Sequence, residues 1–169
     1  MEPVPRVHVI VDGRRSAVEL REPVAWGGGL TYELARWPPG SARFAVRASL
    51  AGIERDGPFS RFPGHRRWSV LAGAGAIELR TAARCYRLAQ RGAIVELDGD
   101  EPIEAVLGDG PAQLFNVLAT VPVRVGVGPS PGPVRLAFAL DDAPELGLSR
   151  GHAMIDAPAV TSRGIVWIE

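Results

Sequence analysis

The chain has 169 residues, the size of one domain, and its 46% hydrophobic content argues against disorder. Its 19 basic residues balance its 19 acidic ones, so it lacks the basic excess that is typical of nucleic-acid-binding proteins. Every basic residue is an arginine, which excludes a Schiff base on lysine, a P-loop lysine and a lysine general base.

Short runs rich in valine, isoleucine and leucine alternate with 20 glycines and 15 prolines along the chain. Many short strands at regular spacing predict an all-β sandwich or barrel. The turn-rich segment Gly126–Pro133 is too short to separate two independently folding domains, so we expect one domain. In chain order, the predicted strands are Val7–Val11, Leu30–Ala35, Phe44–Leu50, Ser69–Leu71, Ala76–Leu79, Ile94–Leu97, Ile103–Leu107, Leu114–Leu118, Val121–Val127, Val134–Leu140 and Gly164–Ile168.

Two of these strands carry polar residues on one face. Alternation places Thr31 and Glu33 on one face of the second strand, and Arg47 and Ser49 on one face of the third. Such a face lies either in solvent or in the mouth of a barrel, and periodicity does not distinguish the two.

Three segments between or beside the predicted strands have distinctive patterns. Thr81–Gln90 is the best helix candidate, but its apolar residues lack helical spacing, so we expect a turn or a strand pair. Gly73-Ala74-Gly75 is interpreted as a hairpin turn. The run Gly27-Gly28-Gly29 would let the backbone pass close to Trp26, to a neighbouring strand or to a ligand.

The residue types that bind metals or act as thiol nucleophiles are few and scattered. His8, His65 and His152 are isolated from one another, so we expect no metal site and no cofactor. Cys85 is the single cysteine, which excludes an internal disulfide, and we interpret it as a packing residue. With no secretory signal and only strand-sized apolar runs, we expect a cytoplasmic protein without a membrane span.

The most individual segment is the loop 56–64, Asp-Gly-Pro-Phe-Ser-Arg-Phe-Pro-Gly. It begins with an Asp-Gly turn and ends with a Pro-Gly turn, and it carries Phe59, Arg61 and Phe62 between them. A loop this constrained loses little entropy on binding, which suits a binding rim. The alternative is that the two phenylalanines only plug the end of a barrel.

Charged residues gather in two regions of the sequence. We interpret these regions as solvated faces, with complementary patches in a self-association surface such as a homodimer as the alternative. The acidic region contains Glu96, Asp98, Asp100, Glu101, Glu104 and Asp109, and the basic region contains Arg55, Arg61, Arg66, Arg67, Arg80, Arg84, Arg87 and Arg91.

The loop 56–64 resembles the hallmark segment of the HutD/Ves family, and other matches follow in the order that this family shows. They are Gly27-Gly28-Gly29 with Thr31 and Glu33, then Arg47, Ser49 and Ala51, then Gly110-Pro111, and finally Phe115-Asn116-Val117. Tyr32, Val46 and Leu114 replace an arginine, a tryptophan and an aspartate of the family pattern, so the chain resembles a diverged member.

The resemblance implies a bicupin, in which two small β-barrel or jelly-roll halves form the single domain 1–169. The first barrel would span roughly residues 20–120, and the second would combine 121–169 with the N-terminal strands. The family is associated with histidine utilisation, which implies a regulatory protein that binds a small carboxylate such as urocanate or formylglutamate. Because we expect no metal site, this binding would be metal-independent. The implied ligand-binding residues are Thr31, Glu33, Arg47, Ser49 and Asn116, with Phe59 and Arg61 at the rim.

Two other functions stay open from the sequence. An enzyme on the same scaffold, an isomerase, cyclase or hydrolase, would use Glu33 as acid or base and Arg47 to stabilise an enolate or oxyanion. A structural protein would instead act through its surface as an oligomer.

Overall fold

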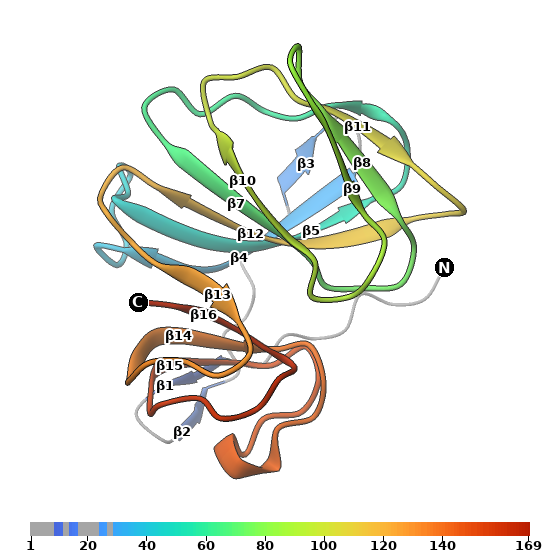
Figure 1. The fold of residues 1–169 in the computed structure, drawn as a ribbon. Helices are drawn as coiled ribbons and strands as arrows, with labels where there is room; N and C mark the ends of the chain where they lie inside the picture. Colours follow the sequence, from blue (N-terminus) through green and yellow to red (C-terminus); the bar gives the residue numbers. More distant parts are fainter. Residues whose placement is uncertain (1–8, 12–13, 17–23, 27–28) are drawn as a thin grey trace. The chain divides into compact units, whose positions relative to one another are not determined.

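The computed structural model describes residues 9–11, 14–16, 24–26 and 29–169, and side chains from residue 29 onward. Apart from one short 3-10 helix, η1 (Pro144–Leu146), the regular elements of the described residues are all strands (Figure 1). The chain divides into two compact units, one formed by Arg21–Pro122 and the other by Met1–Leu20 with Val123–Glu169. We call them the central unit and the terminal unit.

The described strands of the central unit form two antiparallel sheets (Figure 1). The larger sheet has the order β10 (Ile94–Asp98), β7 (Arg66–Leu71), β12 (Ala112–Ala119), β5 (Val46–Ile53), β4 (Gly29–Trp37) and β3 (Val24–Trp26). The smaller sheet has the order β6 (Gly57–Pro58), β11 (Glu104–Leu107), β8 (Ile77–Arg80) and β9 (Cys85–Leu88).

One face of each sheet in the central unit contributes to a shared hydrophobic core. Ile53, Leu71 and Leu114 come from the larger sheet, and Ile77 and Leu79 come from the smaller one. All five side chains are at most 1% exposed. Because the side chains of a strand alternate between its two faces, every second residue of β5, β7 and β12 points into this barrel interior.

The terminal unit holds the third sheet, in which β1 pairs in parallel with β15 while β14 pairs antiparallel with β15 and β16. Its core contains Val134, Ala139, Leu148, Val160 and Ile165. The strand order is β13 (Val125–Val127), β16 (Ile165–Ile168), β14 (Val134–Ala139), β15 (Ala153–Ala157), β1 (Val9–Val11) and β2 (Arg14–Ser16).

Each predicted strand coincides with a strand of the structure, although the bounds shift by up to a few residues, and residues 7 and 8 lie outside the described residues. Four strands were not predicted: β2, β3, β6 and β15. The segment 81–90 holds a turn and β9, as expected. The amides of Ala83 and Arg84 both donate to Oγ1 of Thr81, which stabilises the turn in place of a helix.

The prediction of a hairpin turn at Gly73-Ala74-Gly75 is wrong. The segment crosses from β7 in the larger sheet to β8 in the smaller one. It runs beside the start of β12, where the amides of Ala72 and Gly73 donate to the carbonyl oxygen of Gln113. A side chain at Gly75 would approach the carbonyl oxygen of Pro111 to 2.6 Å, which explains the glycine.

Part of the triple-glycine run also has a structural explanation. Gly27 and Gly28 lie outside the described residues. Gly29 begins β4 opposite Ile53 of β5, and a Cβ atom there would collide with the carbonyl oxygen of Gly52. For Gly29, the close neighbour is therefore the adjacent strand.

Candidate functional site

The barrel interior of the central unit is not apolar throughout. At two levels along the strands, residues that are opposed in register carry polar or charged side chains. Opposed residues of neighbouring strands share a face, so Glu33 of β4, Ser49 of β5, Asn116 of β12 and Ser69 of β7 form one row. We call this set the polar row. Ser49, Asn116 and Ser69 are at most 6% exposed, so the row lies inside the unit and not on a solvated face.

The next row toward the end of the barrel carries three arginines. Arg36 of β4, Arg47 of β5, Leu118 of β12 and Arg67 of β7 are opposed in register. We call this set the arginine row. Leu118 and Arg67 are buried, at 2% and 5% exposure. A buried arginine is unusual because removing its charge from water is costly.

A β-bulge in β4 brings Glu33 and Arg36 together. The register shifts between Glu33 and Ala35, so residues three apart point to the same face. Nε and Nη2 of Arg36 donate to the two carboxylate oxygens of Glu33 at 2.6 and 2.5 Å. The first arginine of the row is therefore neutralised by a bidentate ion pair.

Phenylalanine rings stack between the guanidinium groups of the arginine row. The Cζ atom of Arg47 lies 5.0 Å from the ring centroid of Phe44 and 4.9 Å from that of Phe62. The Cζ atom of Arg67 lies 5.5 Å from the centroid of Phe62 and 5.1 Å from that of Phe59. These contacts are within the range of cation–π attraction, and they hold two like charges on either flank of Leu118.

Among the described residues, no ion pair joins Arg47 or Arg67 to a carboxylate. Nη2 of Arg67 donates to the carbonyl oxygen of Ser60 at 2.8 Å, but Nε of both arginines is buried without a hydrogen-bond partner. Buried donors without partners cost about 1–3 kcal/mol each, and such groups in a native structure call for an explanation.

Burial changes the protonation energetics of both arginines. Burial, followed by the nearby charge of Arg47, lowers the pKa of Arg67 to about 10. Burial also lowers the pKa of Arg47, an effect that the Glu33 carboxylate opposes and the Arg36 charge reinforces. Both guanidinium groups would therefore be stabilised by an anion placed beside them.

The polar row closes the site toward the hydrophobic core. Oγ of Ser69 donates to Oδ1 of Asn116 at 2.6 Å, and this hydrogen bond is buried. The bond fixes the orientation of the Asn116 amide, whose NH2 group provides hydrogen-bond donors. The row beyond it contains Ala51, Leu114 and Leu71, so the interior is apolar from that point on.

Hydrogen bonds to residues 99–107 fix the loop 56–64 and thereby position its phenylalanines. The Phe59 amide donates to the carbonyl oxygen of Ile103, and the Phe62 amide donates to that of Gly99, both at 2.8 Å. The Leu107 amide donates to Oδ1 of Asp56 at 2.8 Å. The loop therefore presents its rings to the arginine row from a rigid support, and residues 99–107 provide that support.

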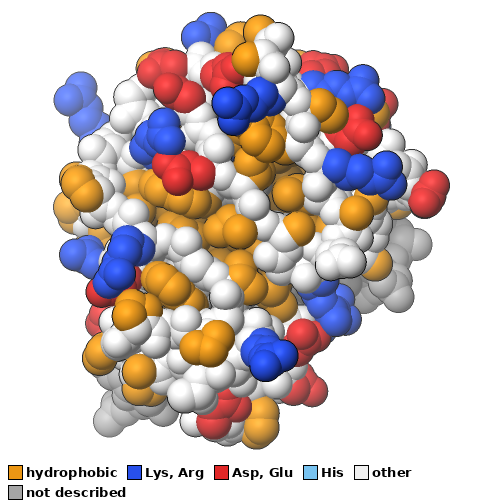
Figure 2. All heavy atoms as spheres, viewed as in Figure 1, with side chains coloured by type: hydrophobic (Ala, Val, Ile, Leu, Met, Phe, Trp, Pro, Cys, Tyr) orange, Lys and Arg blue, Asp and Glu red, His pale blue; other side chains and the backbone are white. Residues whose placement is uncertain are grey.

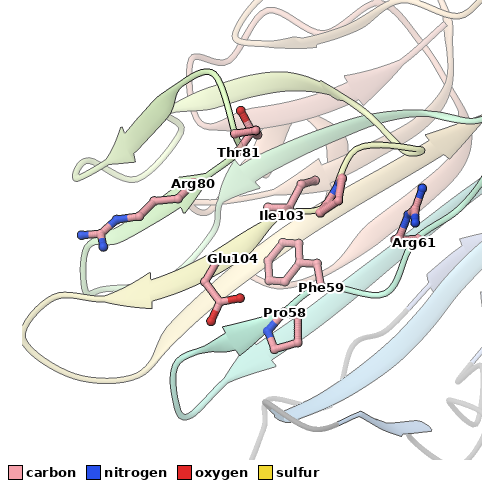
Figure 3. A pocket seen from close by; sticks show the side chains of 9 residues that line it. Pro58, Phe59, Arg61, Arg80, Thr81, Ile103 and Glu104 are labelled. Atoms are coloured by element: carbon pink, nitrogen blue, oxygen red, sulfur yellow. The ribbon is translucent and has the colours of Figure 1, made fainter.

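On its outer side, the same loop borders an open pocket of about 340 Å³, which we call the outer groove (Figure 3). Phe59 takes part in both places, since its ring stacks on Arg67 and also lines the groove. Arg61 lines the groove and donates from Nε to the carbonyl oxygen of Asp100 at 2.9 Å. The groove is lined by Pro58, Phe59, Arg61, Arg80, Thr81, Ala82, Pro102, Ile103 and Glu104.

The residues predicted from the sequence fall into three places. Glu33, Ser49 and Asn116 lie in the polar row with Arg47 in the row beside it, whereas Thr31 is opposite Ala51 in the apolar row. Phe59 stacks on Arg67, and Arg61 lies in the outer groove.

Arg67, Phe44 and Ser69 were not predicted as site residues, and Phe62 was named in the loop 56–64 but not among the implied ligand-binding residues. The predicted strand at Ser69–Leu71 began too late. Had it begun at Arg66, alternation would have placed Arg67 and Ser69 on one face.

The histidines and the cysteine lie apart from the arginine row or beside its rings. His8 is outside the described residues. The His65 ring packs against Phe44 and Phe62, with centroids 5.1 and 6.1 Å apart. Cys85 is exposed, with Sγ 3.6 Å from Oε2 of Glu78, so its interpretation as a packing residue is wrong. Over the described residues, no three His, Cys, Asp or Glu side chains gather in a way that could hold a metal ion.

Charged side chains of both signs intermingle on the face of the molecule that Figure 2 shows. Arg66 pairs with Glu96 and Arg80 pairs with Glu78, at 2.5 and 2.6 Å. The side chains of Arg66 and Glu96 are 55% and 46% exposed, so this pair lies in solvent and adds little stability. Among the described residues, no helix is long and apolar enough to cross a membrane.

Comparison with known proteins places the chain in a family. The HutD family model matches residues 18–125, which include the polar row, the arginine row and the loop 56–64. The chain belongs to the HutD family. Its structure is similar to that of HutD from Pseudomonas fluorescens SBW25 (formate condition), with a TM-score of 0.69 and 27% identity over 90% of this chain and 94% of that one. The predicted all-β class and the bicupin fold of HutD are therefore confirmed.

Other similar proteins either match a smaller part of this HutD-family chain than HutD from Pseudomonas fluorescens does, or have a lower sequence identity to it. Protein Ves from Escherichia fergusonii is 31% identical over 93 residues, 54% of this chain and 49% of the relative. Protein Ves from Citrobacter koseri is 33% identical over 84 residues, 50% of this chain and 44% of the relative. The chain thus spans about half the length of these curated relatives. A conserved protein of unknown function from Pseudomonas aeruginosa PAO1 shares the fold, with a TM-score of 0.64 and 22% identity over 88% of this chain and 89% of that one.

Proposed function

We propose that the central unit binds a small organic carboxylate, without a metal ion, between Arg47 and Arg67. The observation that carries the proposal is that the Nε atoms of Arg47 and Arg67 are both buried without a hydrogen-bond partner, and that neither arginine makes an ion pair with a described residue. A carboxylate there would supply both the missing acceptors and the missing negative charge. Charge-assisted hydrogen bonds of this kind are roughly twice as strong as neutral ones.

The surroundings of the two arginines suit an organic anion with an apolar or planar body. The rings of Phe44, Phe59 and Phe62 provide flat apolar surface, and the Asn116 amide and the Ser49 hydroxyl provide polar groups deeper in the barrel. Ligand sites commonly combine mostly apolar walls with a few polar groups, and they favour the mouths of barrels. Arginine also suits the planar carboxylate group better than lysine does, because it can offer two parallel N–H donors.

The proposal extends to a regulatory role in the use of histidine as a nutrient, in the cytoplasm, with the bound carboxylate as the signal. The structure of HutD from Pseudomonas fluorescens SBW25 was solved in a formate condition, and formate is therefore the first carboxylate that we would examine. Urocanate and N-formylglutamate are the carboxylates of histidine degradation that we would examine next.

Titration calorimetry on the whole chain tests the proposal with matched pairs of ligands. We expect formate, urocanate and N-formylglutamate to bind, and their uncharged amides to bind at least tenfold more weakly, because the amides cannot supply the missing charge. Equal affinity for acid and amide, or no heat with any of the acids, would refute a carboxylate site.

Catalysis with Glu33 as acid or base is the second candidate, and the geometry favours it less. Both oxygens of Glu33 accept hydrogen bonds from Arg36, and a carboxylate held in a bidentate ion pair is a weak base. If the site only binds, Glu33→Gln changes carboxylate affinity through Arg36 and Arg47 but no ligand is turned over. Product detected by NMR with the wild type and not with Glu33→Gln would instead establish an enzyme.

A further inference from the structure

The outer groove combines a buried apolar floor with charged groups at its edge. Phe59 and Ile103 form the floor and are 8% and 4% exposed, and Pro58, Pro102 and Ala82 add further apolar surface. Glu104 and Arg61 lie on different sides of the Phe59 ring in Figure 3. Three segments that are distant in sequence meet at this groove: residues 58–61, 80–82 and 102–104.

The two charges that flank Phe59 are not used by the described part of the chain. No ion pair joins Glu104 or Arg61 to another described residue, and the terminal nitrogens of Arg61 make no hydrogen bond there. Arg80, the other arginine of the groove, is already engaged, since its Nε and Nη2 donate to Glu78 at 3.1 and 2.6 Å. The groove therefore offers one negative and one positive group to a ligand.

We propose that the outer groove is a second binding site, distinct from the arginine row, which takes an extended zwitterion. The ligand's ammonium group would bind Glu104, its carboxylate would bind Arg61, and an apolar body between them would cover Phe59 and Ile103. A simple anion would leave Glu104 unpaired beside it, and a simple cation would leave Arg61 unpaired. The zwitterion is the class that satisfies both groups.

The placement of Glu104 and Arg61 on different sides of the Phe59 ring favours a ligand whose two charges are several bonds apart (Figure 3). Pro58 is opposite Glu104 in the pairing of β6 with β11, and Arg61 lies three residues beyond Pro58, which is roughly 10 Å of extended chain. The charges of an α-amino acid are adjacent and would not reach both groups. An ω-amino acid or a short peptide with an apolar side chain would reach both.

NMR titration of the whole, isotope-labelled protein tests the proposal with a matched ligand series. The probes are 6-aminohexanoate and leucyl-leucine, with hexanoate and hexylamine each lacking one of the charges. We expect both zwitterions to shift the backbone amide signals of Phe59, Arg61, Ala82 and Ile103, with hexanoate and hexylamine binding about tenfold more weakly. Tighter binding of the dipeptide would assign short peptides as the ligand source, and tighter binding of 6-aminohexanoate would assign ω-amino acids.

Substitutions of single charged residues distinguish specific binding in the groove from nonspecific electrostatic attraction. Glu104→Gln and Arg61→Gln should each weaken zwitterion binding about tenfold, because each removes one end of the site. Glu101→Gln and Arg84→Gln are matched controls outside the groove lining and should bind as the wild type does. Wild-type affinity in both groove variants, equal affinity for hexanoate and 6-aminohexanoate, or no shift of groove amides would overturn the proposal.

Discussion

Arg47 and Arg67 place their guanidinium groups against the same phenylalanine ring, with Cζ atoms 4.9 and 5.5 Å from the centroid of Phe62. Two like charges thus lie close together inside a barrel, where burial makes each of them costly. The cation–π contacts offset part of this cost, but they do not supply hydrogen-bond acceptors. Buried ionisable groups with shifted pKa values, such as these two arginines, are common at ligand-binding and catalytic sites.

Removing one buried charge should stabilise the unliganded protein. Lowering the pKa of Arg67 to about 10 corresponds to a penalty of roughly 3 kcal/mol for its charged form, since one pKa unit is about 1.4 kcal/mol. Arg67→Met removes this penalty but also loses the ring contacts and the hydrogen bond to Ser60. We expect the free energy of unfolding, measured in urea, to rise by about 1–2 kcal/mol. A loss of stability would show that Arg67 is mainly a structural residue.

The increase in the free energy of unfolding caused by Arg67→Met should become smaller at high pH. The pKa of Arg67 is lower in the folded state, so above about pH 10 the unfolded chain binds more protons than the folded one. Stability from this group therefore rises with pH through that range, and the charge penalty is complete only below it. The difference in unfolding free energy between variant and wild type should be constant from pH 7 to 9 and shrink above pH 10. A constant difference up to pH 11 would contradict the lowered pKa.

A substitution of Phe62 tests whether the loop 56–64 contributes to ligand binding or only closes the end of the barrel. Phe62→Leu keeps an apolar side chain but removes the ring that both guanidinium groups share. We expect carboxylate affinity to fall about tenfold, since a cation–π contact contributes about 0.5–2 kcal/mol and two are lost. Calorimetry measures the affinity, and urea unfolding measures any loss of packing. Unchanged affinity together with lower stability would mean that Phe62 only closes the barrel.

Gly99 supports the loop that carries these rings. A side chain at this position would approach the carbonyl oxygens of Phe62 and His65 to 2.5 Å, and both are backbone atoms that hydrogen-bond in this turn. Gly99→Ala should lower the free energy of unfolding by about 1–3 kcal/mol and also weaken carboxylate binding, because the loop must shift. Gly132→Ala is the control: it has free space around it and should change stability by less than about 0.5 kcal/mol. Equal effects of the two substitutions would contradict the role of Gly99.

Alternation predicted part of the site well because it depends only on local geometry. It placed Glu33, Arg47 and Ser49 on strand faces, and the resemblance to the HutD/Ves family favoured the interior over solvent. The pairing of strands was not predictable in this way. Arg66 and Arg67 are identical in type and adjacent, yet one lies in solvent with Glu96 and the other is 5% exposed.

The positions of the other site residues depend on contacts between segments that are distant in sequence. Phe59 and Phe62 reach the arginine row, and Arg61 faces the outer groove, because residues 99–107 hold the loop at fixed points. No local pattern in the loop indicates those partners. The bulge that joins Glu33 to Arg36 is likewise set by the pairing of β4 with β5.

We propose above that Arg47 and Arg67 bind a small carboxylate together. The most direct test of this proposal is calorimetric titration of formate, urocanate and N-formylglutamate into the wild type, Arg67→Met and the neighbouring variant Arg66→Gln. Arg66 pairs with Glu96 in solvent and serves as the matched control. We predict that Arg67→Met loses at least tenfold in affinity while remaining folded, and that Arg66→Gln binds as the wild type does. Carboxylate binding by Arg67→Met at wild-type affinity would show that Arg67 does not bind the ligand.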